Sequence, residues 1–271
     1  RCMSGLPSFP RRPGGYGEDV GAVSWFSTPS GIDRIATSAI IRRRSLVGTT
    51  EEDWDREIDT DLKGPFLCAR AVVPHMIKRS YGKIVNISSV AGIVGCIATA
   101  YAASKAAQDL IAEQYFRGFA MPTVRLRLFP HTGPRRPPQF AASSFARQIV
   151  RIERGLAPPR LAVGNLRAVR DFSDVRDVAR AYWLAASRGR PGAVYNVGSG
   201  RGVRIGEVVE ILRSRAAATI EVEVDPRLLR DSDVECLVAD TTRFRSDTGW
   251  QPEIPLERTL EDLLEWWRAH A

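Results

Sequence analysis

The 271-residue sequence is short of lysine, cysteine and histidine, and it contains no long apolar run. Four Lys stand against 35 Arg, and there are four Cys and three His. No apolar stretch reaches the roughly 18 residues that a membrane-spanning helix needs. The cysteines form no C-x-x-C pair and the histidines are scattered, so the spacing of a metal site is missing. We therefore expect no metal site and no membrane partner, and a reducing, cytoplasmic location.

The charge is strongly positive but evenly spread. A net charge of +8 would fit a nucleic-acid ligand if the basic residues formed a stripe. The arginines occur in every segment instead, which favours a composition bias together with a few anion-binding sites. We therefore expect no nucleic-acid partner.

Strand and helix patterns alternate along the chain after residue 33. Residues 83–88 and 123–129 are short apolar strands bounded by glycine or proline, while residues 99–120 and 174–188 carry helical periodicity. This alternation predicts an α/β fold, a doubly wound parallel sheet with helices on both faces. The strand over residues 83–88 should be central in that sheet, with the strand over residues 123–129 as its neighbour or near neighbour.

A further helix is predicted to begin within Thr49-Thr50-Glu51-Glu52. A threonine N-cap there precedes acidic first-turn residues that complement the helix dipole. Helical spacing of apolar residues continues to Met76. Gly64 and Pro65 should kink or break this helix.

Tyr101 and Lys105 are four residues apart on the helix predicted over residues 99–120, so their side chains share one face. An ammonium beside a phenol favours the phenolate and should lower the pKa of the tyrosine from its usual value of about 10. Ser88 and Ser89 end the preceding strand, where a hydroxyl can reach a substrate carbonyl. A tyrosine–lysine pair alone is common on helix surfaces, so only the combination indicates a catalytic site.

The order of these residues carries a family resemblance. V-N-I-S-S-V-A-G-I-V-G followed by Y-A-A-S-K resembles the short-chain dehydrogenase/reductase superfamily, and the resemblance extends back to residue 32. It implies a Rossmann-like sheet, NADP or NAD as cofactor, and a catalytic triad of Ser89, Tyr101 and Lys105. Ser88 is the alternative serine, because in the family the serine stands one residue further from the tyrosine than Ser89 does.

After Lys105 the resemblance changes branch. Motifs from R-L-R-L-F-P-H-T-G-P-R-R to T-G-W-Q-P-E-I-P-L-E, over residues 100–268, resemble the extended NAD-dependent epimerase/dehydratase branch and most closely the GDP-6-deoxy-D-mannose reductases. This branch implies a nucleotide-sugar substrate. The residues implied at the cofactor are Tyr101, Lys105 and Phe129. Those implied at the substrate are His131 near the sugar, Asn165 near the nucleotide, and Arg170 and Arg230 at the pyrophosphate.

Simpler explanations exist for several of these residues. Arg170 opens a run that continues with three aspartates and is equally typical of the charged start of a helix. His131 could cap backbone carbonyls in a loop, and Arg136 is expected to be a solvated loop residue. Where the family has asparagine before His131, this chain has Pro130, which lacks the amide groups for a sugar contact.

Three parts of the chain are expected. Residues 1–33, rich in Pro and Gly, should be irregular; residues 34–160 should form an incomplete dinucleotide-binding domain with the Ser/Tyr/Lys site; residues 161–271 should complete the sheet and form a smaller C-terminal substrate lobe. The implied function is reduction of a GDP-linked 4-keto-6-deoxyhexose by an NAD(P)-dependent oxidoreductase. Three other functions stay open: an epimerase or dehydratase with the same triad, a simple alcohol reductase, and a GDP-sugar-binding chain without catalysis. A homodimer is a further possibility that the sequence leaves open.

The sequence lacks the glycine-rich turn that holds a dinucleotide pyrophosphate. Neither G-x-x-G-x-x-G nor G-x-G-x-x-G occurs, and the 36 residues before Thr37 are too few for the expected strand–helix units. The family's N-N-A-G turn is T-S-A-I here, and its asparagine before Leu62 is Asp61. Two halves that match different branches suggest a recombined or mis-assembled coding sequence, a natural truncation or an engineered hybrid.

We predict that this chain binds NAD(P)H weakly and has little or no turnover. The pyrophosphate needs backbone N–H donors at a helix N-terminus, and the early part of the sequence contains no strand, glycine turn and helix in series. A titration followed by nicotinamide fluorescence measures the binding. Tight binding, or steady NADPH oxidation with a GDP-4-keto sugar, would contradict the prediction.

Overall fold

The structure is a computed structural model that describes residues 34–36, 41, 46–96, 98–229 and 234–271. The expectations for residues 1–33, for the turn that starts at Thr37 and for Arg230 fall outside these ranges. No helix in the described part of the chain combines the length and apolar character needed to cross a bilayer.

Four parallel strands form the central sheet in the order β1-β2-β3-β8. They are β1 (Arg34–Ala36), β2 (Ile84–Ser89), β3 (Thr123–Leu128) and β8 (Val194–Val197). Every residue of β2 is buried, which is typical of a parallel strand covered on both faces. In the register, Ile84 pairs with Thr123 and Ser89 with Leu128. The prediction that strands 83–88 and 123–129 are neighbours inside a parallel sheet is confirmed.

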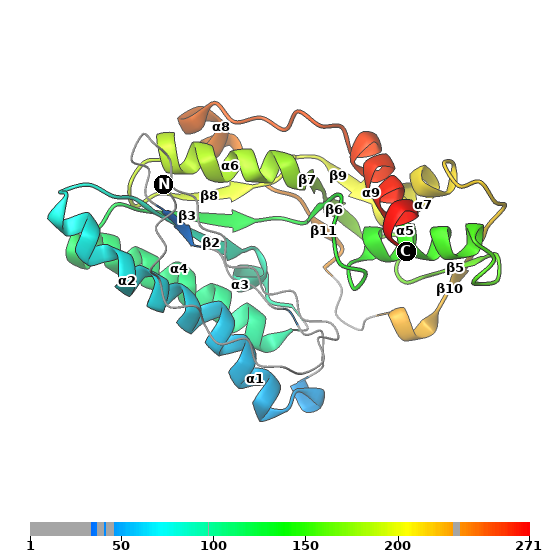
Figure 1. Ribbon diagram of the computed structural model, residues 1–271, viewed down its shortest axis with the longest axis horizontal. Coiled ribbons are helices and arrows are strands. Elements are labelled where there is room, and N and C mark those ends of the chain that lie inside the picture. The colour runs from blue at the N-terminus through cyan, green and yellow to red at the C-terminus, as the bar shows by residue number, and fades with distance from the viewer. Residues whose placement is uncertain (1–33, 37–40, 42–45, 97, 230–233) are drawn as a thin grey trace.

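Helices cover both faces of this sheet (Figure 1). On one face lie α6 (Val175–Arg188) and α8 (Thr242–Thr248); on the other lie α4 (Thr99–Phe119), α2 (Gly64–Lys78) and α1 (Glu51–Ile58). Leu126 of β3 and Trp250, which follows α8, belong to one buried apolar cluster that joins the sheet to α6 and α8. The doubly wound α/β fold predicted from the sequence is confirmed.

The helix predicted to begin within residues 49–52 has a threonine cap, as expected, and the structure shows that this cap is Thr50. The Thr50 side chain accepts a hydrogen bond from the Asp53 backbone N–H at 3.1 Å, and three acidic residues fill the first turn. The expected break at Gly64 and Pro65 lies one turn earlier, as a π-helical turn, η2 (Asp59–Lys63). α2 starts directly at Gly64, because Pro65 occupies a first-turn position where no backbone N–H is required.

An ion-pair cluster fixes α4 against β3. Asp109 of α4 is buried, and its Oδ2 lies 3.3 Å from Arg125 Nη1 and 2.9 Å from Arg127 Nη2. Arg125 also contacts Glu113 Oε2 at 2.9 Å. Removing one partner of a buried pair typically costs about 3–5 kcal/mol. The cluster therefore sets the position of α4 on the sheet.

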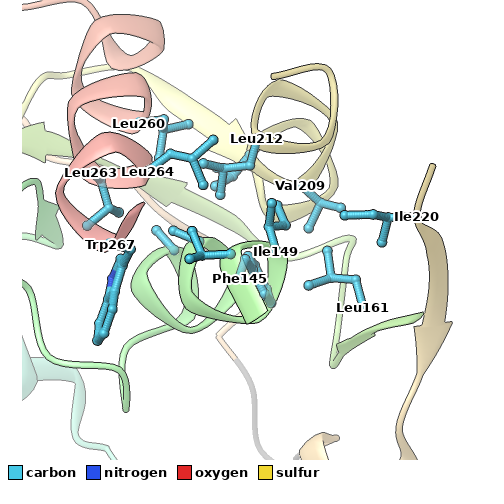
Figure 2. Packing of buried hydrophobic residues seen from close by; sticks show 14 of the residues in the cluster. Phe145, Ile149, Leu161, Val209, Leu212, Ile220, Leu260, Leu263, Leu264 and Trp267 are labelled. Carbon is cyan, nitrogen blue, oxygen red and sulfur yellow. The ribbon is translucent and has the colours of Figure 1, made fainter. Parts of the chain in front are cut away.

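A second apolar core lies beside the sheet. It joins α5 (Ala141–Glu153), α7 (Ile205–Arg213), α9 (Leu256–His270), β5 (Arg160–Val163) and β10 (Glu221–Val224). Phe145 and Ile149 of α5 lie in one cluster with Leu212 of α7 and Leu260 of α9 (Figure 2). The domain boundary expected at residue 160 stays a prediction; α5, which precedes it, packs within this second core.

Short strands and turns connect the two cores. β4 (His131–Thr132) pairs with β7 (Ser173–Asp174) in parallel, and β6 (Val169–Asp171) lies between β11 (Cys236–Leu237) and β9 (Gly202–Arg204). The remaining elements are α3 (Ala91–Val94) and two 3-10 turns, η1 (Leu46–Gly48) and η3 (Pro226–Leu228). These short pairs bring the loops after β3 and β8 close to β6 and β7.

Asp171 holds these loops together from the end of β6. Its Oδ1 accepts from the N–H and the hydroxyl of Ser199, both at 2.6 Å. Its Oδ2 accepts from Gly200 N at 2.8 Å and Ala239 N at 3.1 Å. A Cβ on Gly198 would stand 2.7 Å from the same Oδ2, so only glycine permits this close approach.

We predict that Asp171→Asn lowers the free energy of unfolding by about 1.5–3 kcal/mol, because an amide NH₂ would face backbone N–H donors. Denaturant unfolding measures the change. Asp55→Asn, on the exposed side of α1, is the control and should have little effect. Equal stability of the two variants would show that the Asp171 bonds contribute little.

Candidate active site

Ser88 and Ser89, the last two residues of β2, make different contacts. The Ser88 hydroxyl donates to the Lys105 backbone oxygen at 2.8 Å and is buried, so it ties β2 to α4. The Ser89 hydroxyl accepts from the Ala91 backbone N–H at 3.2 Å, and its interaction with the Tyr101 phenol lowers the pKa of that phenol. Successive residues of a strand face opposite ways, which is why only one of the two serines reaches the phenol. The assignment of Ser89 rather than Ser88 as the serine of the site stays a prediction.

Tyr101 and Lys105 lie on the same face of α4, as their spacing predicts. Lys105 Nζ is 5.6 Å from the centre of the Tyr101 ring. The lysine is 1% exposed, and its Nζ donates to Ile87 O at 3.3 Å and to Gln108 Oε1 at 3.4 Å. Hydroxyl, phenol and ammonium thus meet at the carboxyl end of β2.

The expected low pKa of Tyr101 is wrong for this structure. Burial raises the pKa of Tyr101 to about 12, and the hydrogen bond with Ser89 offsets this only in part. Burial also lowers the pKa of Lys105 to about 8. Desolvation disfavours the charged form of both groups. This effect outweighs the attraction between ammonium and phenolate on which the expected low pKa was based. Tyr101 is therefore a protonated phenol at neutral pH, the state required of a proton donor.

His131 follows β3 after Phe129 and Pro130 and lies in β4. Its Nδ1 donates to Phe129 O at 3.1 Å, and its Nε2 lies 3.4 Å from Arg136 Nη1. Burial, followed by the charge of Arg136, lowers the pKa of His131 to about 4. The imidazole is therefore neutral near pH 7, with Nδ1 protonated and Nε2 accepting from the guanidinium. The carbonyl cap expected from a loop histidine is present, and the sugar contact stays a prediction.

Arg136 is not the solvated loop residue that the sequence suggests. Its guanidinium carbon lies 3.5 Å from the centre of the Phe140 ring, and its charge lowers the pKa of both His131 and Tyr101. The Arg136 backbone oxygen accepts from the Ser143 hydroxyl, which in turn accepts from Trp267 Nε1 at 2.9 Å. A half-buried cation is thus fixed beside the phenol through contacts with α5 and α9.

Tyr182 of α6 interacts electrostatically with Tyr101 and Arg136, and the sequence motifs do not single it out. Its side chain packs against the core under α6, and burial, then the neighbouring Tyr101, raises its pKa while Arg136 lowers it. In the sequence it is one apolar-face position of a helix, so no local pattern distinguishes it.

The implied nucleotide residues lie in the part of the chain that follows α5. Arg170 is in β6, where its Nη1 donates to Val169 O at 2.8 Å. Asn165 lies in the loop after β5, and its Oδ1 accepts from Arg167 N at 3.0 Å. Arg230 falls outside the described residues, so the expected convergence of Arg170 and Arg230 stays a prediction.

The aspartates that follow Arg170 have structural partners. Asp174 is the N-cap of α6 and accepts from Arg176 N at 2.7 Å. Asp177 Oδ2 accepts from the backbone N–H groups of Glu253 and Ile254, each at 2.9 Å. For these carboxylates the charged helix start is the better explanation.

Comparison with known proteins shows that the two parts of the chain match two different family models. The model of the GDP-mannose 4,6 dehydratase family matches residues 98–263, more than half of the chain. The chain belongs to this family. The short chain dehydrogenase model matches residues 27–127. Both resemblances carried by the sequence motifs are therefore confirmed, the family in the second half and the wider superfamily in the first.

Individual relatives show the same division. A GDP-6-deoxy-D-mannose reductase of Pseudomonas aeruginosa is 37% identical over 169 residues, which cover 62% of this chain and 56% of the relative. A 3-oxoacyl-(acyl-carrier-protein) reductase of Thermotoga maritima is 34% identical over 158 residues, covering 58% and 59%. The chain spans about half the length of the curated relatives it matches.

A solved structure extends the likeness to the fold. The structure of RMD from Pseudomonas aeruginosa complexed with NADPH superposes with a TM-score of 0.74 and 29% identity. The superposition covers 88% of this chain and 81% of that one. The Rossmann-like fold predicted from the sequence is therefore confirmed over most of the chain.

Proposed function

We propose that the chain is an NAD(P)H-dependent reductase of a nucleotide-activated sugar, acting on the 4-keto group of a GDP-linked 6-deoxyhexose. The observation that carries the proposal is the meeting of Ser89, Tyr101 and Lys105 at the carboxyl end of β2. Membership of the GDP-mannose 4,6 dehydratase family supports the substrate class. The 37% identity to a GDP-6-deoxy-D-mannose reductase supports reduction.

In this proposal each residue of the site has one role. Ser89 donates a hydrogen bond to the carbonyl oxygen of the sugar, which orients it. Tyr101, protonated at neutral pH, gives its proton to that oxygen as negative charge develops on it. Lys105 supplies a positive charge close to the phenol, which stabilises the phenolate left after the proton has gone.

NADPH or NADH supplies the hydride when bound. The residues at the nicotinamide end fit such a group, because a buried ammonium, a phenol and a hydroxyl offer donors for ribose hydroxyls where the sheet ends. Tyr101, Lys105 and the buried Phe129 would hold that end. The pyrophosphate end lacks a glycine turn in the sequence, which is the basis for expecting weak binding.

The nucleotide sugar would bind between the two cores. His131 Nε2, which carries no proton near pH 7, would accept from a sugar hydroxyl, Asn165 would contact the nucleotide, and Arg170 and Arg230 would hold the diphosphate. Arg136 joins this set in our proposal, because its guanidinium lies beside both His131 and the reacting phenol.

Two other functions use the same site. An epimerase or dehydratase would need the same proton donor, and the GDP-mannose 4,6-dehydratases among the relatives favour it. A chain that binds GDP-sugars without catalysis is favoured by the missing glycine turn. Product analysis distinguishes the first, and binding without NADPH oxidation distinguishes the second.

We predict that Tyr101→Phe lowers the rate of NADPH oxidation with a GDP-4-keto-6-deoxyhexose by about 10²- to 10⁴-fold at high NADPH, because the phenyl ring has no proton to give. Calorimetry should show unchanged affinity for the GDP-sugar. Tyr115→Phe, about four turns further along the same helix, is the matched control and should keep wild-type turnover.

Three outcomes are separable in that experiment. Wild-type protein that binds no GDP-sugar rejects the substrate class. Binding with no turnover at any NADPH concentration favours the binding function. Equal turnover by Tyr101→Phe and Tyr115→Phe rejects Tyr101 as the proton donor.

We predict that Arg170→Ala weakens GDP binding by about 1.5–3 kcal/mol, because it removes a charge-assisted hydrogen bond to the diphosphate. Isothermal titration with GDP measures the change. The control is Arg201→Ala, which removes an exposed arginine before β9 and should leave the affinity unchanged. Equal affinities of the two variants would make Arg170 a structural residue of β6.

A further inference from the structure

The loop between β4 and α5 holds Arg136 in a conformation that the backbone does not favour by itself. Arg135, the preceding residue, has a φ of 68°, in the left-handed region that residues other than glycine rarely adopt. Pro134 and Pro137 flank the two arginines and restrict the backbone further. A residue in such a conformation persists only where surrounding contacts hold it there. The contacts of Arg136 therefore show what holds this loop.

The backbone of Arg136 is bound on both sides. Its N–H donates to Gly133 O at 3.2 Å, and its carbonyl oxygen accepts from the hydroxyl of Ser143. Ser143 lies in the first turn of α5 and has 0% exposure. Its oxygen also accepts from Trp267 Nε1 at 2.9 Å. Because an indole N–H can only donate and a hydroxyl has a single proton, the Ser143 proton is left for the Arg136 carbonyl.

The other end of this chain of hydrogen bonds is fixed in the second core. Trp267 is buried and belongs to the apolar cluster that joins α5, α7 and α9 (Figure 2). On α5, Ala142 and Phe145 lie on either side of Ser143 in the sequence and belong to the same cluster. The Ser143 hydroxyl therefore has a packed support, to which it fastens the loop of Arg136.

The side chain of Arg136 meets His131 in the candidate active site. Its Nη1 lies 3.4 Å from His131 Nε2, and its guanidinium carbon lies 3.5 Å from the centre of the Phe140 ring. His131 has a support of its own, because it pairs with Ser173 in the register of β4 and β7. A movement of the Arg136 loop would therefore take the guanidinium away from a histidine that stays in place.

We propose that Ser143 is a positioning residue for sugar recognition: its hydroxyl fastens the Arg136 loop to the second core, which keeps the guanidinium against His131. Without the hydroxyl, the Arg136 carbonyl and the Trp267 N–H would lose the partner they share. Arg135 would then leave the left-handed conformation, and the guanidinium would move away from His131. Ser143 touches no substrate and acts through Arg136. The link to the sugar rests on the proposed function, whereas the link between Ser143 and His131 does not.

The three histidines of the chain allow a direct test. At pH 7 the ¹⁵N chemical shift of an unprotonated imidazole nitrogen shows whether that nitrogen accepts a hydrogen bond. The spectrum is recorded on the full chain without ligand, and His131→Gln identifies the His131 signals by their loss. Arg136→Met removes the guanidinium and should move the Nε2 signal toward the value of a free imidazole nitrogen. Ser143→Ala should move it in the same direction.

The neighbouring serine supplies the control. The Ser144 hydroxyl accepts from Gln148 Nε2 at 3.3 Å within α5. Ser144→Ala removes a hydroxyl from the same turn and should leave the His131 signal at its wild-type position. An unchanged His131 signal in folded Ser143→Ala would overturn the proposal. If Ser143→Ala does not fold, Ser143→Cys decides, because a thiol fills the space but donates only weakly; an unchanged His131 signal there would also overturn it.

Calorimetry with GDP-mannose and with GDP tests the link to the sugar. Ser143→Ala should weaken binding of GDP-mannose by about 3- to 10-fold and leave GDP binding unchanged, because Arg136 lies beside the histidine implied at the sugar. An equal change for both ligands, or none, would overturn the proposal and make Ser143 a structural residue. Wild-type protein that binds neither ligand rejects the proposed function, whereas the His131 signal still decides whether Ser143 positions the guanidinium.

Discussion

Lys105 places a primary amine in the interior of the protein. The arrangement of the site depends on the groups that stabilise the positive charge of this buried amine. The amine is 1% exposed and donates to Ile87 O and Gln108 Oε1. Backbone and amide oxygens satisfy its hydrogen bonds but supply no full negative charge, so burial still lowers its pKa. Any element that holds α4 against the sheet is therefore also an element that holds the ammonium beside Tyr101.

Two buried polar networks perform that task near the middle of α4. In one, Asp109 pairs with two arginines of β3. In the other, the Ser88 hydroxyl bonds to the Lys105 carbonyl, and Gln108 connects the helix to β2 and to the turn of Asp61. Each network would be costly if half of it were lost, because the remaining partner would be buried alone. This favours one position of α4 over alternatives that differ by a small shift.

The substrate side of the site is built by the second core. The loop that carries His131 and Arg136 is held at the Arg136 carbonyl by Ser143 of α5, which in turn contacts Trp267 of α9. Trp267 lies at the edge of the apolar cluster shown in Figure 2. Packing in that cluster therefore determines where the guanidinium stands relative to Tyr101, although the two residues come from different parts of the fold.

The sequence by itself determined the alternation of strands and helices, the neighbouring parallel strands, a threonine cap within residues 49–52 and the face shared by Tyr101 and Lys105. These features depend on residue spacing and on local hydrogen bonds, which a linear pattern contains. It left Ser88 and Ser89 open, and only the tertiary structure shows that the Ser88 hydroxyl bonds to α4 while Ser89 interacts with the phenol, because successive residues of β2 face opposite ways. It was wrong about the pKa of Tyr101 and the exposure of Arg136, and it gave no sign of Tyr182. Those properties depend on how much water each group loses and which charges surround it, and both are set only when distant segments pack together.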